Sequence, residues 1–286
     1  MKYLPSIYTL ILIILPHIIS FRLVCNRCIS SSLSMTAKVN IYNSVENLGN
    51  SLCSDIKIMA QSEITKKGSF YLAVPGGSVL KLLSGLKNDN NGPKVDWSKV
   101  YLFYVNHKCV PMTDPSATHL KAKGLFIDKL NIPDKNVFSL KDGETKGHDS
   151  DAHDYEKSLL SSGIPIEKAN GLPAFDFMLL GVGKDGHIGS LYPGRKEVSL
   201  TNKWVYSVDK KSPASITLSL PIMNNAKETR VILMGADKAE AALIGITKSK
   251  KPEDFPVCGI KSEGTTWMID APCSDLVKTK VSCILK

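Results

Sequence analysis

The chain has 286 residues, 43% of them hydrophobic, and a formal net charge of +9 at pH 7. This composition favours one α/β domain that follows a short presequence, and nothing in it suggests a second domain. Residues 1–38 contain four basic residues and no acidic residue, which leaves +5 for the rest of the chain. There the lysines are scattered among acids, which argues against a nucleic-acid binder and suits an anionic small molecule.

Residues 1–38 are predicted to be a presequence, with the functional domain spanning residues 39–286. The apolar stretch 3–19 contains two prolines, is too short for a membrane span, and is typical of a secretory signal. Residues 21–38 are rich in serine and free of acids, as in transit peptides. The two-part pattern resembles the bipartite presequences of algae and their relatives, whose plastids have extra membranes. We therefore expect a plastid location; the alternatives are a signal anchor, an ER-lumen enzyme, or a cytoplasmic protein that starts near Met35.

Helical and strand patterns alternate along the rest of the chain. We predict helices over 45–61, 79–86, 117–130 and 236–247, and strands over 70–74, 100–105, 175–180 and 231–235. Such alternation predicts a single α/β domain with a largely parallel sheet and helices on both faces.

A glycine loop follows the first of these strands and opens the next helix. It contains Gly76, Gly77 and Ser78. Glycines let the backbone approach a ligand closely, and amide groups at a helix start favour phosphate or another anion. We predict that these three residues bind phosphate; the alternative is a simple turn.

The most informative segment is the apolar strand 175–180 with the glycine-rich turn that follows it. The turn delivers Asp185, Gly186 and His187. Ligands bind at the carboxyl ends of parallel strands, so a histidine at this place is well positioned as a general base. The alternative is a loop histidine that caps nearby backbone groups.

Residues 179–194 resemble the signature of the 6-phosphogluconolactonases, which typically read Leu-Leu-Gly-x-Gly-x-Asp-Gly-His-x-x-Ser-Leu-Phe-Pro-Gly. Residues 74–78 resemble the first glycine loop of that family, and residues 216–226 resemble its late strand with an Asn-Asn element. Residues 106–108 occupy the place of its Asp-Glu-Arg strand end. The resemblance spans about residues 39–273 and implies a Rossmann-like fold of the sugar-phosphate isomerase type.

The resemblance implies hydrolysis of 6-phosphoglucono-1,5-lactone to 6-phosphogluconate, a step of the oxidative pentose phosphate pathway. Opening an ester carbonyl requires a nucleophilic water, a base and a positive charge near the developing oxyanion. We assign His187 as the base, Asp185 as the group that orients the imidazole or a sugar hydroxyl, and Lys108 as a catalytic cation.

A phosphorylated sugar lactone is the expected partner, and neither a cofactor nor a metal is needed. Four further histidines are expected to be solvated rather than metal ligands: His107, His119, His148 and His153. Seven cysteines at irregular spacing argue against a disulfide framework. We expect no stable membrane association of the mature domain, and the sequence leaves its oligomeric state open.

Three positions depart from the family pattern. Lys108 replaces an arginine, keeping the charge but losing the planar bidentate fork. Ser215 stands where an arginine often contacts phosphate. Arg195 and Lys196 follow the Pro-Gly turn in place of a histidine. Either cation is a candidate for the missing phosphate charge; the alternative is that both are solvated.

Two other functions compete with lactone hydrolysis. Glucosamine-6-phosphate deaminases share the fold and the Gly-x-Asp-Gly-His turn, but continue it into Phe-Asn-Glu and carry an essential aspartate at the first strand end. Here residues 190–194 continue differently and Asn106 replaces that aspartate, which favours the lactonase. A noncatalytic phosphosugar-binding paralogue is supported by the three departures and opposed by the intact His187 turn.

Overall fold

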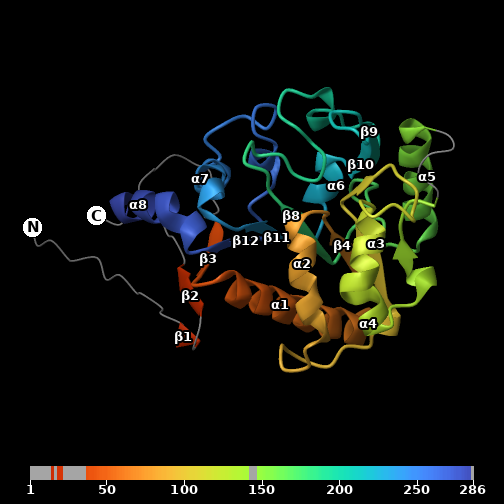
Figure 1. Ribbon diagram of the computed structural model, residues 1–286, viewed down its shortest axis with the longest axis horizontal. Helices are drawn as coiled ribbons and strands as arrows, with labels where there is room; N and C mark the ends of the chain where they lie inside the picture. Colours follow the sequence, from red (N-terminus) through yellow and green to blue (C-terminus); the bar gives the residue numbers. More distant parts are fainter. Residues whose placement is uncertain (1–13, 16–17, 22–36, 142–146, 285–286) are drawn as a thin grey trace, which may run out of the picture.

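The computed structural model describes residues 14–15, 18–21, 37–141 and 147–284, and most of the predicted presequence lies outside these ranges. Seven parallel strands form the central sheet (Figure 1). In spatial order they are β3 (Lys38–Tyr42), β12 (Thr265–Asp270), β11 (Glu228–Leu233), β8 (Phe177–Gly181), β4 (Phe70–Val74), β5 (Val100–Tyr104) and β7 (Val137–Phe138). Beyond β3, the short strands β2 (Ile18–Phe21) and β1 (Ile14–Leu15) continue the sheet in antiparallel pairing.

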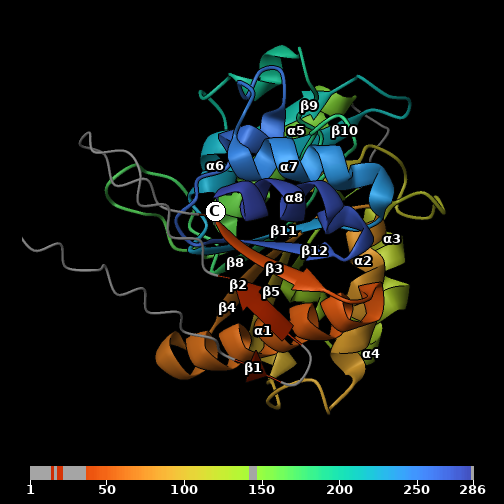
Figure 2. The ribbon, with the colours of Figure 1, turned by 90° about the vertical axis from the view of Figure 1, so that its left-hand side faces the viewer.

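Helices cover both faces of the sheet. Figure 2 shows α7 (Ala239–Thr247) and α8 (Asp275–Ile284) on one side and α1 (Val45–Lys67) on the other. All residues of β4 and β12 are buried, as expected for strands whose two faces are both covered. The predicted fold class, a single α/β domain with a largely parallel sheet between helices, is confirmed. Among the described residues, no helix is long and apolar enough to cross a membrane.

The helix predicted over 45–61 extends six residues further in the structure, because the glycine that ends it comes later in the chain. Ser44 accepts a hydrogen bond from the amide of Asn47 at the helix start. Gly68 adopts the left-handed conformation (φ 81°), and its amide donates to the carbonyl of Ile64. A glycine in this conformation is a common helix stop, so the helix continues to Lys67.

The glycine loop leads into α2 (Ser78–Leu82), which a 3-10 turn (Leu83–Lys87) extends over the rest of the predicted helix. The predicted helix over 117–130 divides into α3 (Thr118–Ala122), a π-helical turn (Lys123–Ile127) and α4 (Asp128–Leu130).

A second, smaller sheet was not predicted. It is antiparallel, in the order β6 (Asn106–Lys108), β10 (Ser215–Leu218) and β9 (Val205–Val208). Helix α5 (His148–Ser161) packs against β9 and β10, and α6 (Leu220–Asn224) follows β10 in the chain. This sheet brings Lys108 opposite Ser215, two positions that are far apart in the sequence.

Candidate active site

The turn after β8 is closed by backbone hydrogen bonds. The amide of Gly183 donates to the carbonyl of His187 at 2.9 Å, and the amide of Gly186 donates to the carbonyl of Gly183 at 3.0 Å. Gly186 has φ 81°, and a Cβ there would lie 2.3 Å from the ring of Phe255. Glycine is therefore required at position 186 for both conformation and space.

His187 and Asp185 form a close pair in this turn. The imidazole Nδ1 lies 2.5 Å from Oδ1 of Asp185, and their side chains are 25% and 53% exposed. Burial raises the pKa of Asp185, but the hydrogen bond and the charge of His187 outweigh it and leave that pKa below its ordinary value. An ionised Asp185 accepts a hydrogen bond from Nδ1–H, so Nε2 keeps the lone pair that a general base needs.

The aromatic ring of Tyr192 packs against the imidazole of His187. Its centroid lies 4.7 Å from that of the His187 imidazole. The ammonium of Lys211 lies 5.0 Å from the same tyrosine centroid. Tyr192 is buried. Its ring contacts both the candidate base and a lysine that sequence analysis did not single out.

A network of polar groups connects the other motifs. The amide of Gly76 donates to Oδ1 of Asn106 at 3.1 Å, and Nδ2 of Asn106 lies 3.5 Å from Oγ of Ser190. The hydroxyl of Ser215 donates to Oγ of Ser190 at 2.8 Å, while the amide of Ser190 donates to Thr217. The structure thus brings the glycine loop, the β5 strand end, the histidine turn and β10 together.

The glycine loop and the histidine turn lie at the same edge of the sheet, because they follow β4 and β8, which pair in parallel. Gly77 is exposed, has φ 79°, and would have no atom within 4 Å of a Cβ added there. Ser78 is exposed at the start of α2. Since Gly76 already donates to Asn106, Gly77 and Ser78 are the loop residues that face open space.

The prediction that His107 is solvated is wrong. Its side chain is fully buried in the middle of β6. Nε2 accepts the amide hydrogen of His119 at 3.0 Å, and Nδ1 lies 2.7 Å from the carbonyl of Lys108, to which it donates. Burial lowers the pKa of His107 to about 4, so the ring is neutral at pH 7 and connects β6 to α3.

His119 is also partly buried, and its Nδ1 lies 2.9 Å from the hydroxyl of Tyr104, so the prediction of a solvated ring fails here too. His148 and His153 are exposed, as predicted.

The burial of His107 predicts a specific dependence of stability on pH. The unfolded chain binds a proton at His107 near pH 6.5, whereas the folded chain does so only near pH 4. Folding stability contributed by the neutral ring is therefore present above pH 6.5 and is lost as the pH falls towards 4, by roughly 3 kcal/mol in total. Urea unfolding of wild type and His107→Gln at pH 7 and pH 4.5 measures this loss. We expect the free energy of unfolding of His107→Gln to depend less on pH than that of the wild type. The exposed control His153→Gln should keep the wild-type pH dependence. If His107→Gln behaves like this control, the assignment is contradicted.

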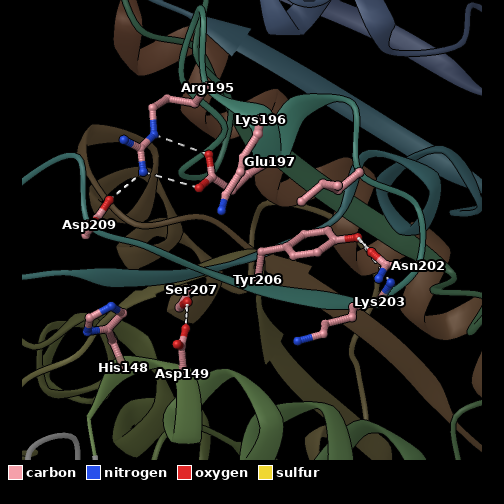
Figure 3. A pocket seen from close by; sticks show the side chains of 11 residues that line it. His148, Asp149, Arg195, Lys196, Glu197, Asn202, Lys203, Tyr206, Ser207 and Asp209 are labelled. Carbon is pink, nitrogen blue, oxygen red and sulfur yellow. Dashed lines mark hydrogen bonds and ion pairs between the residues drawn. The ribbon is translucent and has the colours of Figure 1, made fainter.

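Arg195 lies in the wall of a cavity of about 480 Å³ between β9, the start of α5 and the segment after the Pro-Gly turn. Figure 3 shows its guanidinium facing the carboxylates of Glu197 and Asp209. The guanidinium lies 3.2 Å from Glu197 and also pairs with Asp209.

Lys196 lines the same cavity, but His187, Asp185 and Lys108 do not. The geometry of the Asp185–His187 pair, rather than the size of this cavity, therefore locates the candidate active site. Two carboxylates already balance the charge of Arg195, so Arg195 is a weaker candidate for the phosphate contact.

In the part of the chain that the structure describes, no three His, Cys, Asp or Glu side chains are grouped so that they could hold a metal ion. The four cysteines described there are free and buried: Cys53, Cys109, Cys258 and Cys273. Burial raises the pKa of the Cys109 thiol, so it remains protonated.

The structure contains a parallel α/β sheet with a carboxylate–imidazole pair and a glycine loop at one edge, the arrangement that the family resemblance implies. A family model described as glucosamine-6-phosphate isomerases/6-phosphogluconolactonase matches residues 43–268. The chain belongs to this family.

Two similar relatives carry lactonase names. The 6-phosphogluconolactonase 3, chloroplastic, of Arabidopsis thaliana is 32% identical over 246 residues, which cover 83% of this chain and 74% of the relative. The probable 6-phosphogluconolactonase 4, chloroplastic, of Oryza sativa subsp. indica is 32% identical over 253 residues, covering 85% and 78%.

Solved structures agree on the fold. A 6-phosphogluconolactonase from Leishmania guyanensis superimposes with a TM-score of 0.72 at 21% identity, covering 84% of this chain and 98% of that one. A monomeric glucosamine-6-phosphate deaminase superimposes with a TM-score of 0.68 at 19% identity, covering 84% and 99%. Because both activities occur on this fold, the fold alone does not choose between them.

Proposed function

We propose that the protein hydrolyses 6-phosphoglucono-1,5-lactone to 6-phosphogluconate. The observation that carries the proposal is the Asp185–His187 pair, 2.5 Å apart at the carboxyl end of β8 and partly open to solvent. The relatives named 6-phosphogluconolactonases, at 32% identity over most of the chain, support it. The continuation of the turn through Ser190 and the asparagine at position 106 also favour the lactonase over the deaminase.

In the proposed reaction, Nε2 of His187 removes a proton from a water molecule as its oxygen attacks the lactone carbonyl carbon. The resulting tetrahedral oxyanion collapses and breaks the bond between that carbon and the ring oxygen. The imidazolium returns its proton to the departing ring oxygen, which becomes a hydroxyl, and the new carboxylic acid ionises. Asp185 accepts the hydrogen bond from Nδ1–H throughout the reaction and stabilises the imidazolium.

The remaining predicted residues, apart from Arg195, bind the substrate in this proposal. Lys108 supplies positive charge to the oxyanion or to the phosphate. Gly77 and Ser78 offer amide and hydroxyl hydrogens to the phosphate from the exposed loop. Gly76 and Ser215 also belong to the phosphate site, and their hydrogen bonds to Asn106 and Ser190 hold the loop and the turn in place.

An assay with both family substrates tests the proposal. Purified protein that begins near Met35 is incubated separately with 6-phosphogluconolactone and with glucosamine 6-phosphate. We expect acid release from the lactone above its spontaneous rate and no ammonia from the amino sugar. Ammonia release would identify the deaminase instead.

The basic residues give a second prediction. Lys108→Ala is expected to lower kcat/KM for the phosphorylated lactone by about tenfold or more, the effect of removing one charge-assisted contact. Arg195→Ala should have a much smaller effect, because two carboxylates already balance Arg195. Lys108→Arg should preserve or raise activity by restoring the fork. If Arg195→Ala is the more damaging change, the phosphate charge belongs to the segment after the Pro-Gly turn.

We also propose that residues 1–38 direct the domain 39–286 to a plastid. The relatives named chloroplastic support this location, as does the acid-free composition of the segment. A fluorescent reporter fused to residues 1–38 should reach the plastid of an alga with a complex plastid. Deleting residues 21–38 should leave the reporter in the secretory system. Cytosolic fluorescence from the full segment would support a cytoplasmic protein that starts near Met35.

A further inference from the structure

The segment 250–259, which follows α7 in the chain, lies against the turn that carries His187. The amide of Val257 donates to the carbonyl of Gly186 at 3.0 Å. The ring of Phe255 is so close that a Cβ at Gly186 would lie 2.3 Å from Cδ1 and 2.5 Å from Cγ and Cε1. Because Gly186 directly precedes His187, the segment contacts the backbone from which the candidate base projects.

The same segment also holds the chain beyond the turn. The carbonyl of Glu253 accepts the amide hydrogen of Gly194 at 2.8 Å. Gly194 lies two residues after Tyr192, whose ring packs on the imidazole of His187. The segment therefore fixes the backbone both before and after these two rings.

Side chains and carbonyls from two helices anchor the segment itself. Asn224, the last residue of α6, donates from Nδ2 to the carbonyl of Gly259 at 2.8 Å and accepts the amide hydrogen of Lys261 at 2.8 Å. The thiol of Cys258 donates to the carbonyl of Ile244 in α7 at 3.5 Å. An anchored segment can act as a brace, because it does not move together with the turn that it supports.

Phe255 fills the space that the glycine leaves. Its side chain is buried, with 5% of the residue exposed, and the ammonium of Lys250 lies 5.3 Å from the ring centroid. Since Gly186 has no side chain, the ring packs directly on its backbone. Close packing of this kind restricts motion, and removing the ring would leave a void next to the turn.

We propose that Phe255 is a positioning residue for the candidate base. Its ring, together with the amide of Val257, holds Gly186 and thereby sets where the His187 imidazole meets the reacting water. The role of His187 in this inference rests on the proposed lactonase function. Catalysis is sensitive to such a contact, because a small displacement of a reacting group lowers the rate steeply. Phe255 offers no polar group to a substrate, so its effect belongs to kcat and not to KM.

The test compares Phe255→Leu with Phe70→Leu. Phe70 is fully buried at the start of β4, the end of that strand opposite the glycine loop. Both changes remove a buried ring and keep an apolar side chain, and thermal unfolding identifies a temperature at which both variants are folded. We expect Phe255→Leu to lower kcat for 6-phosphogluconolactone about tenfold with KM little changed. Phe70→Leu should keep the wild-type kcat. Phe255→Tyr retains the ring atoms that face Gly186 and should retain most of the activity.

NMR gives a readout that does not depend on the reaction. The Hε1–Cε1 signal of the candidate base is assigned by its absence in His187→Ala. This signal should shift in Phe255→Leu and stay in place in Phe70→Leu. If the wild type hydrolyses no lactone and the signal still shifts only in Phe255→Leu, the proposed function fails and the brace remains.

Three results would overturn the inference. The first is an unshifted His187 signal in folded Phe255→Leu, whatever its activity. The second is an equal fall of kcat in Phe255→Leu and Phe70→Leu, which would reflect a general loss of packing. The third is a rise in KM with unchanged kcat, which would mean that Phe255 shapes the substrate site and does not position the base.

Discussion

Replacing His187 by alanine is expected to lower kcat for lactone hydrolysis by about a hundredfold or more, the usual contribution of a general base. The imidazole is held by Asp185 with Nε2 free to accept a proton, so its loss removes the step that activates water. Binding of 6-phosphogluconate should persist, because deprotonation of water contributes to the transition state and not to the bound complex. Single-turnover kinetics and calorimetric binding measure the two effects separately.

The control for this change is His153→Ala, which removes an exposed histidine from α5. It should leave both kcat and binding at wild-type values. A His187→Ala variant with near wild-type turnover would reject His187 as the base.

Gly183→Ala should cause a loss of similar size, although it replaces neither His187 nor Asp185. A Cβ at this position would lie 2.0 Å from Nδ1 of His187 and 2.6 Å from Oδ1 of Asp185. The imidazole must therefore move, and a displacement of about 1 Å at a reacting group can cost a hundredfold in rate. We expect kcat to fall about a hundredfold while the protein remains folded.

Gly124→Ala is the matched control, because no atom lies within 4 Å of a Cβ at position 124. Thermal unfolding of both variants establishes that they are folded. Wild-type kcat in a folded Gly183→Ala protein would show that the observed imidazole position is not needed for catalysis.

The sequence was most informative where local pattern and tertiary position agree. A short apolar run that ends in glycines predicted the strand and turn that carry His187, and the structure contains both as β8 and a closed turn. The predicted strand over 70–74 coincides with β4. Both strands are buried on two faces, so their side chains form continuous apolar runs. The catalytic roles themselves remain predictions.

The errors arose where long-range pairing determines the environment of a residue. His107 is flanked by polar residues, which suggested solvent, but β6 pairs with β10 and places its middle side chain in the interior. A strand of three residues is too short to show an alternating pattern, so burial at this position could not be inferred locally.

Lys211 illustrates a second limit. No motif marks it, and it lies in a loop among other polar residues. Only the folded chain brings it against Tyr192 and thus near His187. Arg195 shows the reverse, because its place after the Pro-Gly turn suggested a phosphate contact, whereas the fold gives it two carboxylate partners.

The rate of lactone opening by the wild-type protein tests the central claim most directly. The disappearance of 6-phosphogluconolactone is followed at several protein concentrations, at a pH and temperature where the spontaneous reaction is slow. Our account predicts a rate that rises in proportion to protein concentration and exceeds the spontaneous rate. A rate equal to the spontaneous one at every concentration, from protein that still binds 6-phosphogluconate, would contradict it and identify a noncatalytic phosphosugar-binding protein.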